Sequence, residues 1–107
     1  MNTQFKKGVL EIIVLEIVDQ SDRYGYELIT EVSKVVDVEK GTIYPLLKRM
    51  TNDKLFTTYL MESNEGPPRK YYKLTALGKE RLVIIKSEWE LFSSRVNDFL
   101  KGSANND

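Results

Sequence analysis

The stretch "EKGTIYPLLKRM", residues 39–50, has the spacing of an amphipathic helix although Pro45 stands in its middle. On a helix, at about 100° per residue, one side is apolar and consists of Ile43, Leu46, Leu47 and Met50. The other side carries Gly41, Tyr44, Pro45, Lys48 and Asn52, with Thr42 and Arg49 near the boundary. Pro45 lacks an N–H and crowds the carbonyl of Gly41, a residue that adjusts more easily than others. The sequence therefore predicts a distorted but tolerated helix over residues 39–52 that shows a ring and basic groups to solvent.

Two helical segments precede this stretch. Residues 24–36 place Leu28, Ile29, Val32 and Val36 on one face, and only a short link through Asp37 separates them from the next helix. Two helices joined in this way match a helix-turn-helix. Residues 5–18 are apolar almost all round, and a helix of this kind is buried on every side. In so short a chain, this pattern predicts a second subunit.

The composition changes after the helix-turn-helix. Residues 55–62, "LFTTYLME", and residues 69–75, "RKYYKLT", are rich in β-branched and aromatic side chains. The turn residues "SNEGPP" lie between them, so we expect a β-hairpin with a loop of about six residues. Pro67 and Pro68 are expected in that loop, where they do not disturb strand pairing.

A long helix is expected to follow the hairpin, from an N-cap at Thr75 to about Leu100. Its apolar residues are spaced three and four apart, which is a heptad seam that needs a partner helix. The seam consists of Leu82, Ile85, Trp89, Phe92, Val96 and Phe99. The polar tail, residues 102–107, is expected to be frayed.

The composition excludes several kinds of site. The chain has 107 residues, which fits one domain, and it contains neither cysteine nor histidine. A disulfide framework, a histidine-based triad and an ordinary Cys/His zinc site are therefore excluded, and we expect no metal, no cofactor and no enzyme activity. The apolar runs are too short to cross a membrane, and no signal-peptide cleavage pattern follows the N-terminus, so we expect a cytoplasmic protein.

The charge is neutral in total but unevenly distributed. The sixteen basic and sixteen acidic residues balance, yet residues 40–54 have a net charge of +3 and residues 67–81 of +4, against −5 for residues 8–33. In a winged-helix arrangement the two positive segments lie side by side, where a helix in the major groove and a basic hairpin would meet phosphates. The alternative is a winged-helix protein-interaction module without DNA binding. Such a module should expose an apolar patch, whereas the exposed side of the third helix is mixed and basic.

Four segments together resemble the PadR family of bacterial transcriptional regulators. They are "KGVLEIIVLEIV", "YGYELI", "GTIYPLLKRM" and "GPPRKYYKLTALGKERL". The resemblance covers residues 5 to 82 closely, and the single last helix is similar to the short subfamily, which includes multidrug-responsive members. It implies a mainly α fold with a small β-hairpin: a winged helix-turn-helix over residues 1–74 and a long C-terminal dimerisation helix over residues 75–101. It also implies a homodimer that binds an operator dyad in double-stranded DNA and represses a neighbouring gene.

The exposed Tyr44 and Pro45 correspond to the recognition-helix surface of that family. Together with the charge pattern, this gives a predicted set of DNA-binding residues. They are Lys40, Thr42, Tyr44, Pro45, Lys48, Arg49, Arg69, Lys70 and Lys73.

Two positions depart from the family pattern. Pro67 stands where the wing usually has an arginine, which removes one expected contact at the wing tip. Lys54 stands where a glycine usually follows the recognition helix. Because a left-handed backbone would cost a lysine roughly 1 kcal/mol or more, we expect Asn52 or Asp53 to take that turn instead.

The tryptophan in the seam suggests an effector site. Trp89 has Ile85, Phe92 and Val96 within one or two turns, and "SEWELF" resembles the aromatic-lined site between subunits of multidrug-responsive relatives. A planar aromatic molecule stacking on Trp89 is therefore expected as the effector. The alternative is that Trp89 packs in the dimer core and binds no ligand.

Overall fold

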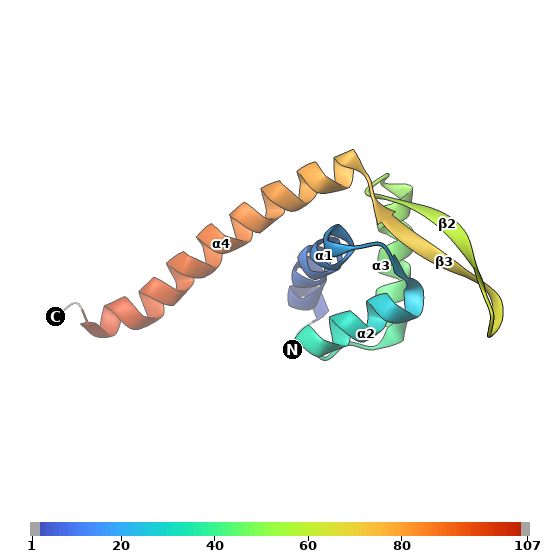
Figure 1. Cartoon of the computed structure of the whole chain (residues 1–107). Coiled ribbons are helices and arrows are strands. Elements are labelled where there is room, and N and C mark those ends of the chain that lie inside the picture. The colour runs from blue at the N-terminus through green and yellow to red at the C-terminus, as the bar shows by residue number, and fades with distance from the viewer. Residues whose placement is uncertain (1–2, 106–107) are drawn as a thin grey trace.

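The structure is a computed structural model that describes the backbone of residues 3–105 and the side chains of residues 8–102. A group of three helices carries a twisted hairpin on one side, and the last helix extends away from it on the other (Figure 1). The elements in chain order are α1 (Thr3–Gln20), β1 (Arg23–Tyr24), α2 (Gly25–Val35), α3 (Lys40–Asn52), β2 (Phe56–Ser63), β3 (Gly66–Leu74) and α4 (Ala76–Asn105). This is a winged helix-turn-helix with a long C-terminal helix, so the predicted fold class is confirmed.

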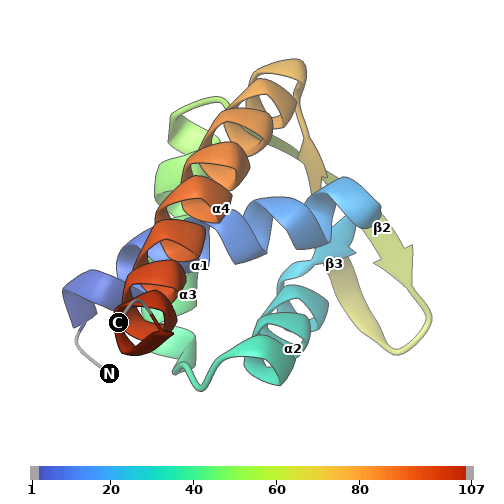
Figure 2. The same cartoon turned by 90° about the vertical axis from the view of Figure 1, so that its left-hand side faces the viewer.

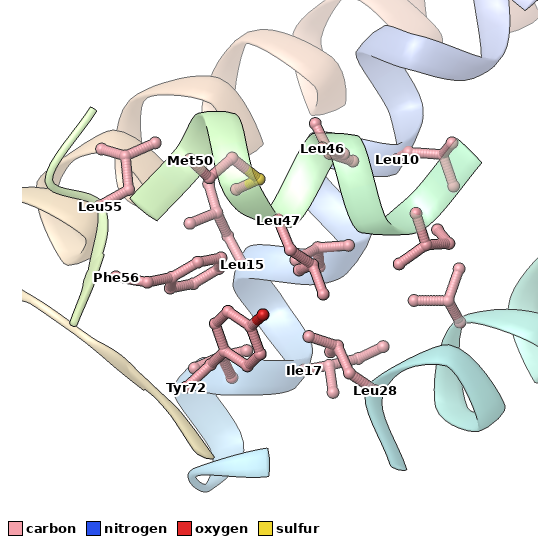
Figure 3. Packing of buried hydrophobic residues seen from close by; sticks show 14 of the residues in the cluster. Leu10, Leu15, Ile17, Leu28, Leu46, Leu47, Met50, Leu55, Phe56 and Tyr72 are labelled. Carbon is pink, nitrogen blue, oxygen red and sulfur yellow. The ribbon is translucent and has the colours of Figure 1, made fainter. Parts of the chain in front are cut away.

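One apolar core joins all parts of the fold. The residues of α1 that form its centre, Leu10, Val14 and Leu15, are almost completely buried. The predicted apolar side of α3 packs on them, and Phe56 and Tyr72 close the core from the sheet (Figure 3). Leu82 and Ile85 of α4 belong to the same core. On the remaining side of α1, Ile12 and Ile13 are only half-buried in the single chain.

The sheet has one strand more than the hairpin that the sequence predicts. Its order is β1-β3-β2 and all pairs are antiparallel. In β1, Arg23 pairs with Tyr72 and Tyr24 pairs with Tyr71. A strand of two residues is too short to show the alternation of apolar and polar side chains that predicts a strand. The sequence therefore predicts a second helix that begins at Tyr24, whereas α2 begins at Gly25 in the structure.

The prediction that Pro67 and Pro68 lie in the hairpin loop is wrong. Strand β3 begins at Gly66, and only Asn64 and Glu65 connect it to β2. Both prolines lie where the register shifts between the pairs Met61–Arg69 and Ser63–Gly66. Such a bulge tolerates residues without an N–H, and β1 reaches only as far as Tyr71, so the other side of β3 is an open edge there.

The prediction that Asn52 or Asp53 takes the turn after α3 is also wrong. Lys54 has φ 68°, the one positive φ of a non-glycine residue in the described chain. Its N–H donates to the carbonyl of Thr51 at 3.0 Å, and the N–H of Leu55 donates to that of Met50 at 3.0 Å. These two bonds form a Schellman motif, which requires the left-handed residue at this position. The buried pair Met50 and Leu55 supplies the apolar contact that accompanies the motif.

The start of α4 is capped as predicted and ties into the same turn. The N–H of Gly78 donates to Oγ1 of Thr75 at 2.9 Å, which is the expected N-cap bond. The Thr75 hydroxyl lies 2.6 Å from the carbonyl oxygen of Lys54. A Cβ on Gly78 would collide with the carbonyl of Leu55, so a residue larger than glycine does not fit there.

The last helix is longer than predicted. It continues to Asn105, past the expected end near Leu100, with Gly102 inside it. Part of the tail predicted to fray is therefore helical, because a glycine lowers helix stability by only about 1 kcal/mol and does not break a helix as proline does. Residues 106 and 107 lie outside the described residues.

Candidate nucleic-acid interface

The two sides of α3 are divided as the sequence predicts. Ile43, Leu46, Leu47 and Met50 are buried, whereas Lys40, Tyr44, Pro45, Lys48 and Arg49 are exposed and Thr42 is half-buried. The exposed side continues onto α2, where the ring of Tyr26 is 60% exposed. The Nζ atom of Lys40 lies 5.9 Å from the centroid of that ring. Tyr26 was not among the predicted site residues, although its place opposite buried Leu28 on α2 could have indicated it.

Tyr44 is a surface residue with a structural contact. Its Cε1 atom would lie 3.4 Å from a Cβ at Gly25, so the ring rests on the first residue of α2. Burial raises the pKa of Tyr72, and Tyr44 makes a smaller contribution in the same direction. Tyr44 therefore contacts α2 on one side while the residue remains 48% exposed.

Arg49 faces away from the centre of the exposed side. Its Nη2 atom lies 3.5 Å from Oε2 of Glu11 on α1, and its Nη1 atom lies 3.7 Å from Oδ2 of Asp53. The side chain is still 54% exposed. Of the predicted basic residues on α3, this one is already engaged by two carboxylates of its own chain.

The three basic residues of β3 occupy both faces of the hairpin. Lys70 lies on the same face as buried Tyr72, with its Nζ atom 5.8 Å from that ring. Arg69 lies on the opposite face, 4.5 Å above the ring of Tyr24, and pairs with Glu65 at 3.8 Å. Lys73 is on the Arg69 face but at the base of the hairpin, where it borders a hollow with Asp19 and other residues at the end of α1. The structure therefore does not bring the three together as one cluster.

A ladder of tyrosine rings crosses the three strands. Tyr24 and Tyr71 have ring centroids 5.6 Å apart, and Tyr71 stacks on Tyr59 at 5.5 Å. The hydroxyl of Tyr59 donates to Oδ2 of Asp22 at 2.6 Å, which raises the pKa of Tyr59 to about 12. Arg69 covers the outer end of the ladder. The ladder fixes the wing to the segment that leads into α2.

The predicted effector residues lie on one side of α4. Ile85, Trp89 and Phe92 line a groove of about 370 Å³ between α4 and the start of α1, with Val9, Ile12, Glu11 and Arg81 among the other lining residues. Figure 2 shows α4 crossing α1 at this place. Val96 lies one turn beyond the groove and is exposed.

The described residues hold no group of three or more acidic side chains able to bind a metal ion, and none of the helices in residues 3–105 is long and apolar enough to cross a membrane. The glutamates of α1 and of the start of α2 have partners within the fold. Glu11 pairs with Arg81, Glu16 with Lys86, and Glu27 accepts the N–H of Tyr24 at 3.2 Å.

A helix-turn-helix with an exposed basic helix, a basic wing and a long terminal helix defines the winged-helix class of nucleic-acid-binding proteins. The model of the transcriptional regulator PadR-like family matches residues 14–83. The chain belongs to this family and is a DNA-binding transcriptional regulator, which is not a class of enzyme.

Solved structures agree with the family. A PadR-like transcriptional regulator from Bacillus cereus strain ATCC 14579 is 45% identical, with a TM-score of 0.83 over 92% of this chain and 97% of that one. A transcriptional regulator from Streptococcus is 37% identical, with a TM-score of 0.82 over 92% and 98% of the two chains. An uncharacterized protein, protein X of Lysinibacillus sphaericus, is 30% identical over 100 residues, which are 90% of this chain and 92% of that protein.

Proposed function

We propose that this protein is a homodimeric repressor that binds an operator dyad through α3 and the wing and is released by a planar aromatic effector. The observation that carries the DNA-reading role is the exposed side of α3. Tyr44 and Lys48 stand on it with Pro45 between them, over a fully buried opposite side. A helix of this kind, anchored by its apolar face, can enter the major groove without disturbing the core.

The predicted DNA-binding residues are assigned two roles. Tyr44, Lys48 and neighbouring Thr42 and Lys40 face the bases, whereas Lys70 and Arg69 on the wing contact phosphates. Base contacts set specificity and phosphate contacts set affinity and salt dependence. Lys73 stands further from the wing tip and is assigned to the backbone beside the base of the hairpin.

Dimerisation is supported by apolar surface that the single chain leaves exposed. Trp89, Phe92 and Val96 continue the α4 seam beyond its buried start, and Phe92 is 61% exposed. Side chains of this size rarely form an exposed stripe on a monomer. A second copy related by a two-fold axis would cover the stripe and the half-buried side of α1. Its two recognition helices would then lie about 34 Å apart, one turn of DNA.

The effector role rests on the groove beside Trp89. Its walls are mostly apolar, and an indole offers a wide face and one N–H to a flat ligand. A ligand releases DNA only if it prefers the state that does not bind the operator. A change in the angle of α4 would alter the spacing of the two recognition helices and provide such a preference.

The DNA flanking the gene provides the test. Fluorescence anisotropy with the upstream fragment and with random DNA of equal length should give tighter binding to the upstream fragment, and in vitro transcription from it should fall when protein is added. Equal affinity for both fragments at all salt concentrations would reject a sequence-specific regulator.

For the effector, planar aromatic compounds are titrated while Trp89 emission is followed, with operator present and absent. If no compound quenches Trp89 at concentrations that release the operator, the effector site does not include Trp89.

A further inference from the structure

One carboxylate, largely shielded from solvent, connects three helices of the fold. The Nε atom of Arg81, on α4, donates to Oε1 of Glu11 at 2.9 Å. The Nη2 atom of Arg49, on α3, lies 3.5 Å from Oε2 of the same Glu11. The side chain of Glu11, which comes from α1, is only 13% exposed. Two guanidinium groups from different helices therefore share a single carboxylate.

The other ion pairs between α1 and α4 do not have this property. Glu16 pairs with Lys86 at 2.9 Å, and Asp19 pairs with Lys79. Both acidic side chains are more exposed than Glu11, and in the described part of the chain neither has an ion pair with α3. Exposed pairs of this kind contribute little, typically below about 1 kcal/mol. They provide matched controls for Glu11 and Arg81.

The shared carboxylate also borders the groove beside Trp89. Glu11 and Arg81 both line it, so a molecule bound there would touch the contact between them. Arg49 does not line that groove and lies on α3, among the predicted DNA-binding residues. Glu11 is thus the point at which the groove meets the DNA-binding helix.

We propose that Arg81 and Arg49 compete for Glu11, and that this competition couples the position of α4 to DNA binding. While Arg81 occupies one oxygen of Glu11, Arg49 has only long contacts, 3.5 Å to Glu11 and 3.7 Å to the exposed Asp53, so it can turn to a DNA phosphate. When Arg81 leaves, Arg49 can take both oxygens in the bidentate geometry that guanidinium and carboxylate prefer. Arg49 is then withheld from the phosphate, and operator affinity falls. Glu11 acts as a positioning residue in this scheme, which rests on the proposed DNA binding.

A displaced α4 and an Arg81→Ala substitution should therefore have the same effect. In Arg81→Ala, we expect the plot of log binding constant against log salt concentration to be shallower by about 0.9 unit, because one phosphate contact is lost. The change should be the same on operator and on random DNA. The same substitution should change nothing in an Arg49→Ala background, since the contact is already absent. It should also change nothing in a Glu11→Gln background, because the amide no longer holds Arg49. Lys86→Ala removes one positive charge from the same helix and should leave the slope unchanged.

The scheme is overturned if Arg81→Ala and Lys86→Ala give equal salt slopes of DNA binding. It is also overturned if the decreases in salt slope from Arg81→Ala and Arg49→Ala add in the double variant. A second readout needs no DNA. The Nε–H resonance of Arg49 in ¹⁵N-labelled protein should shift in Arg81→Ala and return towards its solvated position in Arg81→Ala/Glu11→Gln, whereas Glu16→Gln should not move it. An unchanged Arg49 resonance in Arg81→Ala rejects the competition. Failure of the wild type to bind any DNA rejects the proposed function instead, and the resonance still decides whether Glu11 is shared.

Discussion

The hydroxyl of Thr75 lies 2.6 Å from the carbonyl oxygen of Lys54, and this contact joins the turn after α3 to the beginning of α4. Thr75 also caps the start of α4, because its Oγ1 atom accepts a hydrogen bond from the N–H of Gly78. The N–H of Thr75 itself donates to the carbonyl of Leu55 at 3.1 Å. The direction in which α4 leaves the domain is therefore set by a few backbone groups at the turn after α3.

Replacing Lys54 by glycine should stabilise the fold. Lys54 has φ 68°, a region that costs a residue with a Cβ about 1 kcal/mol and costs glycine almost nothing. We expect Lys54→Gly to raise the free energy of unfolding by up to about 1 kcal/mol, measured by chemical denaturation at fixed protein concentration. Asp53→Gly is the control, because Asp53 has φ −80° and gains no relief from strain. A Lys54→Gly variant no more stable than the wild type would show that the turn is not strained.

Gly78→Ala should have the opposite effect. The new methyl group would overlap the carbonyl of Leu55 and a methyl of Leu74, and a carbonyl cannot move without breaking the turn. We expect a loss of about 1–3 kcal/mol, the usual cost of overpacking. Gly8→Ala, on α1, meets nothing within 4 Å and should be neutral or slightly stabilising. Equal thermal midpoints for the two variants would contradict the close approach of α4 to the turn.

The sequence predicts the helices and the hairpin because their patterns are local. The spacing of Ile43, Leu46 and Met50 is enough to orient α3, and Thr75 is a readable N-cap. The errors arise where tertiary contacts decide the outcome. Lys54 is left-handed because Met50 and Leu55 close a buried Schellman motif, and Pro67 enters a strand because a bulge accepts it. The short strand at Arg23 exists only through its pairing with Tyr72.

The sequence was enough to predict which of the candidate residues on α3 are exposed, but not which residues they contact. Placing Tyr44 and Lys48 on an exposed face requires only helix periodicity, which the sequence provides. The partners of Arg49 and Arg81 could not be predicted, because Glu11 is 38 residues from the first and 70 from the second. Ion pairs between residues so far apart in the sequence depend on how the helices cross, and no local sequence pattern predicts that crossing.

Tyr59 should ionise later than an ordinary tyrosine. Its hydrogen bond to Asp22 favours the protonated phenol and raises its pKa to about 12. Since the pKa is higher in the folded state, the stabilising contribution is complete below the unfolded pKa near 10 and is lost as the pH rises towards 12. Subtracting the ultraviolet titration curve of Tyr59→Phe from that of the wild type should leave the ionisation of Tyr59 alone. In an Asp22→Asn background, the midpoint of the same difference curve should move back towards pH 10. A midpoint near pH 10 in the wild type would rule out the hydrogen bond from Tyr59 to Asp22.

Phe92→Glu should prevent dimerisation. Phe92 is exposed in the single chain, so the substitution leaves the core around Leu15 and Leu82 intact, but it places a charge in the proposed interface. We expect a folded monomer that does not bind the operator. Sedimentation velocity measures the oligomeric state, and circular dichroism checks the fold. Glu88→Gln, at the edge of the groove and nearer the start of α4, is a control that should sediment as the wild type does. A wild type that is monomeric at micromolar concentration would reject the two-fold arrangement.

The residues of α3 and the wing should differ in how they affect DNA binding. Lys70→Ala removes a charge from the wing, so it should weaken binding to all sequences and lower the salt slope by about one unit. Tyr44→Ala removes no charge and should instead reduce the ratio of operator to random affinity, at an unchanged slope. The ring of Tyr44 also rests on Gly25, so circular dichroism and the thermal midpoint are recorded to confirm that the variant is folded. Lys48→Ala should combine both effects, because Lys48 carries a charge on the helix that we propose faces the bases. Gel shifts across several salt concentrations separate the two roles, and an equal loss of operator and random binding in Tyr44→Ala would show that α3 does not read the sequence.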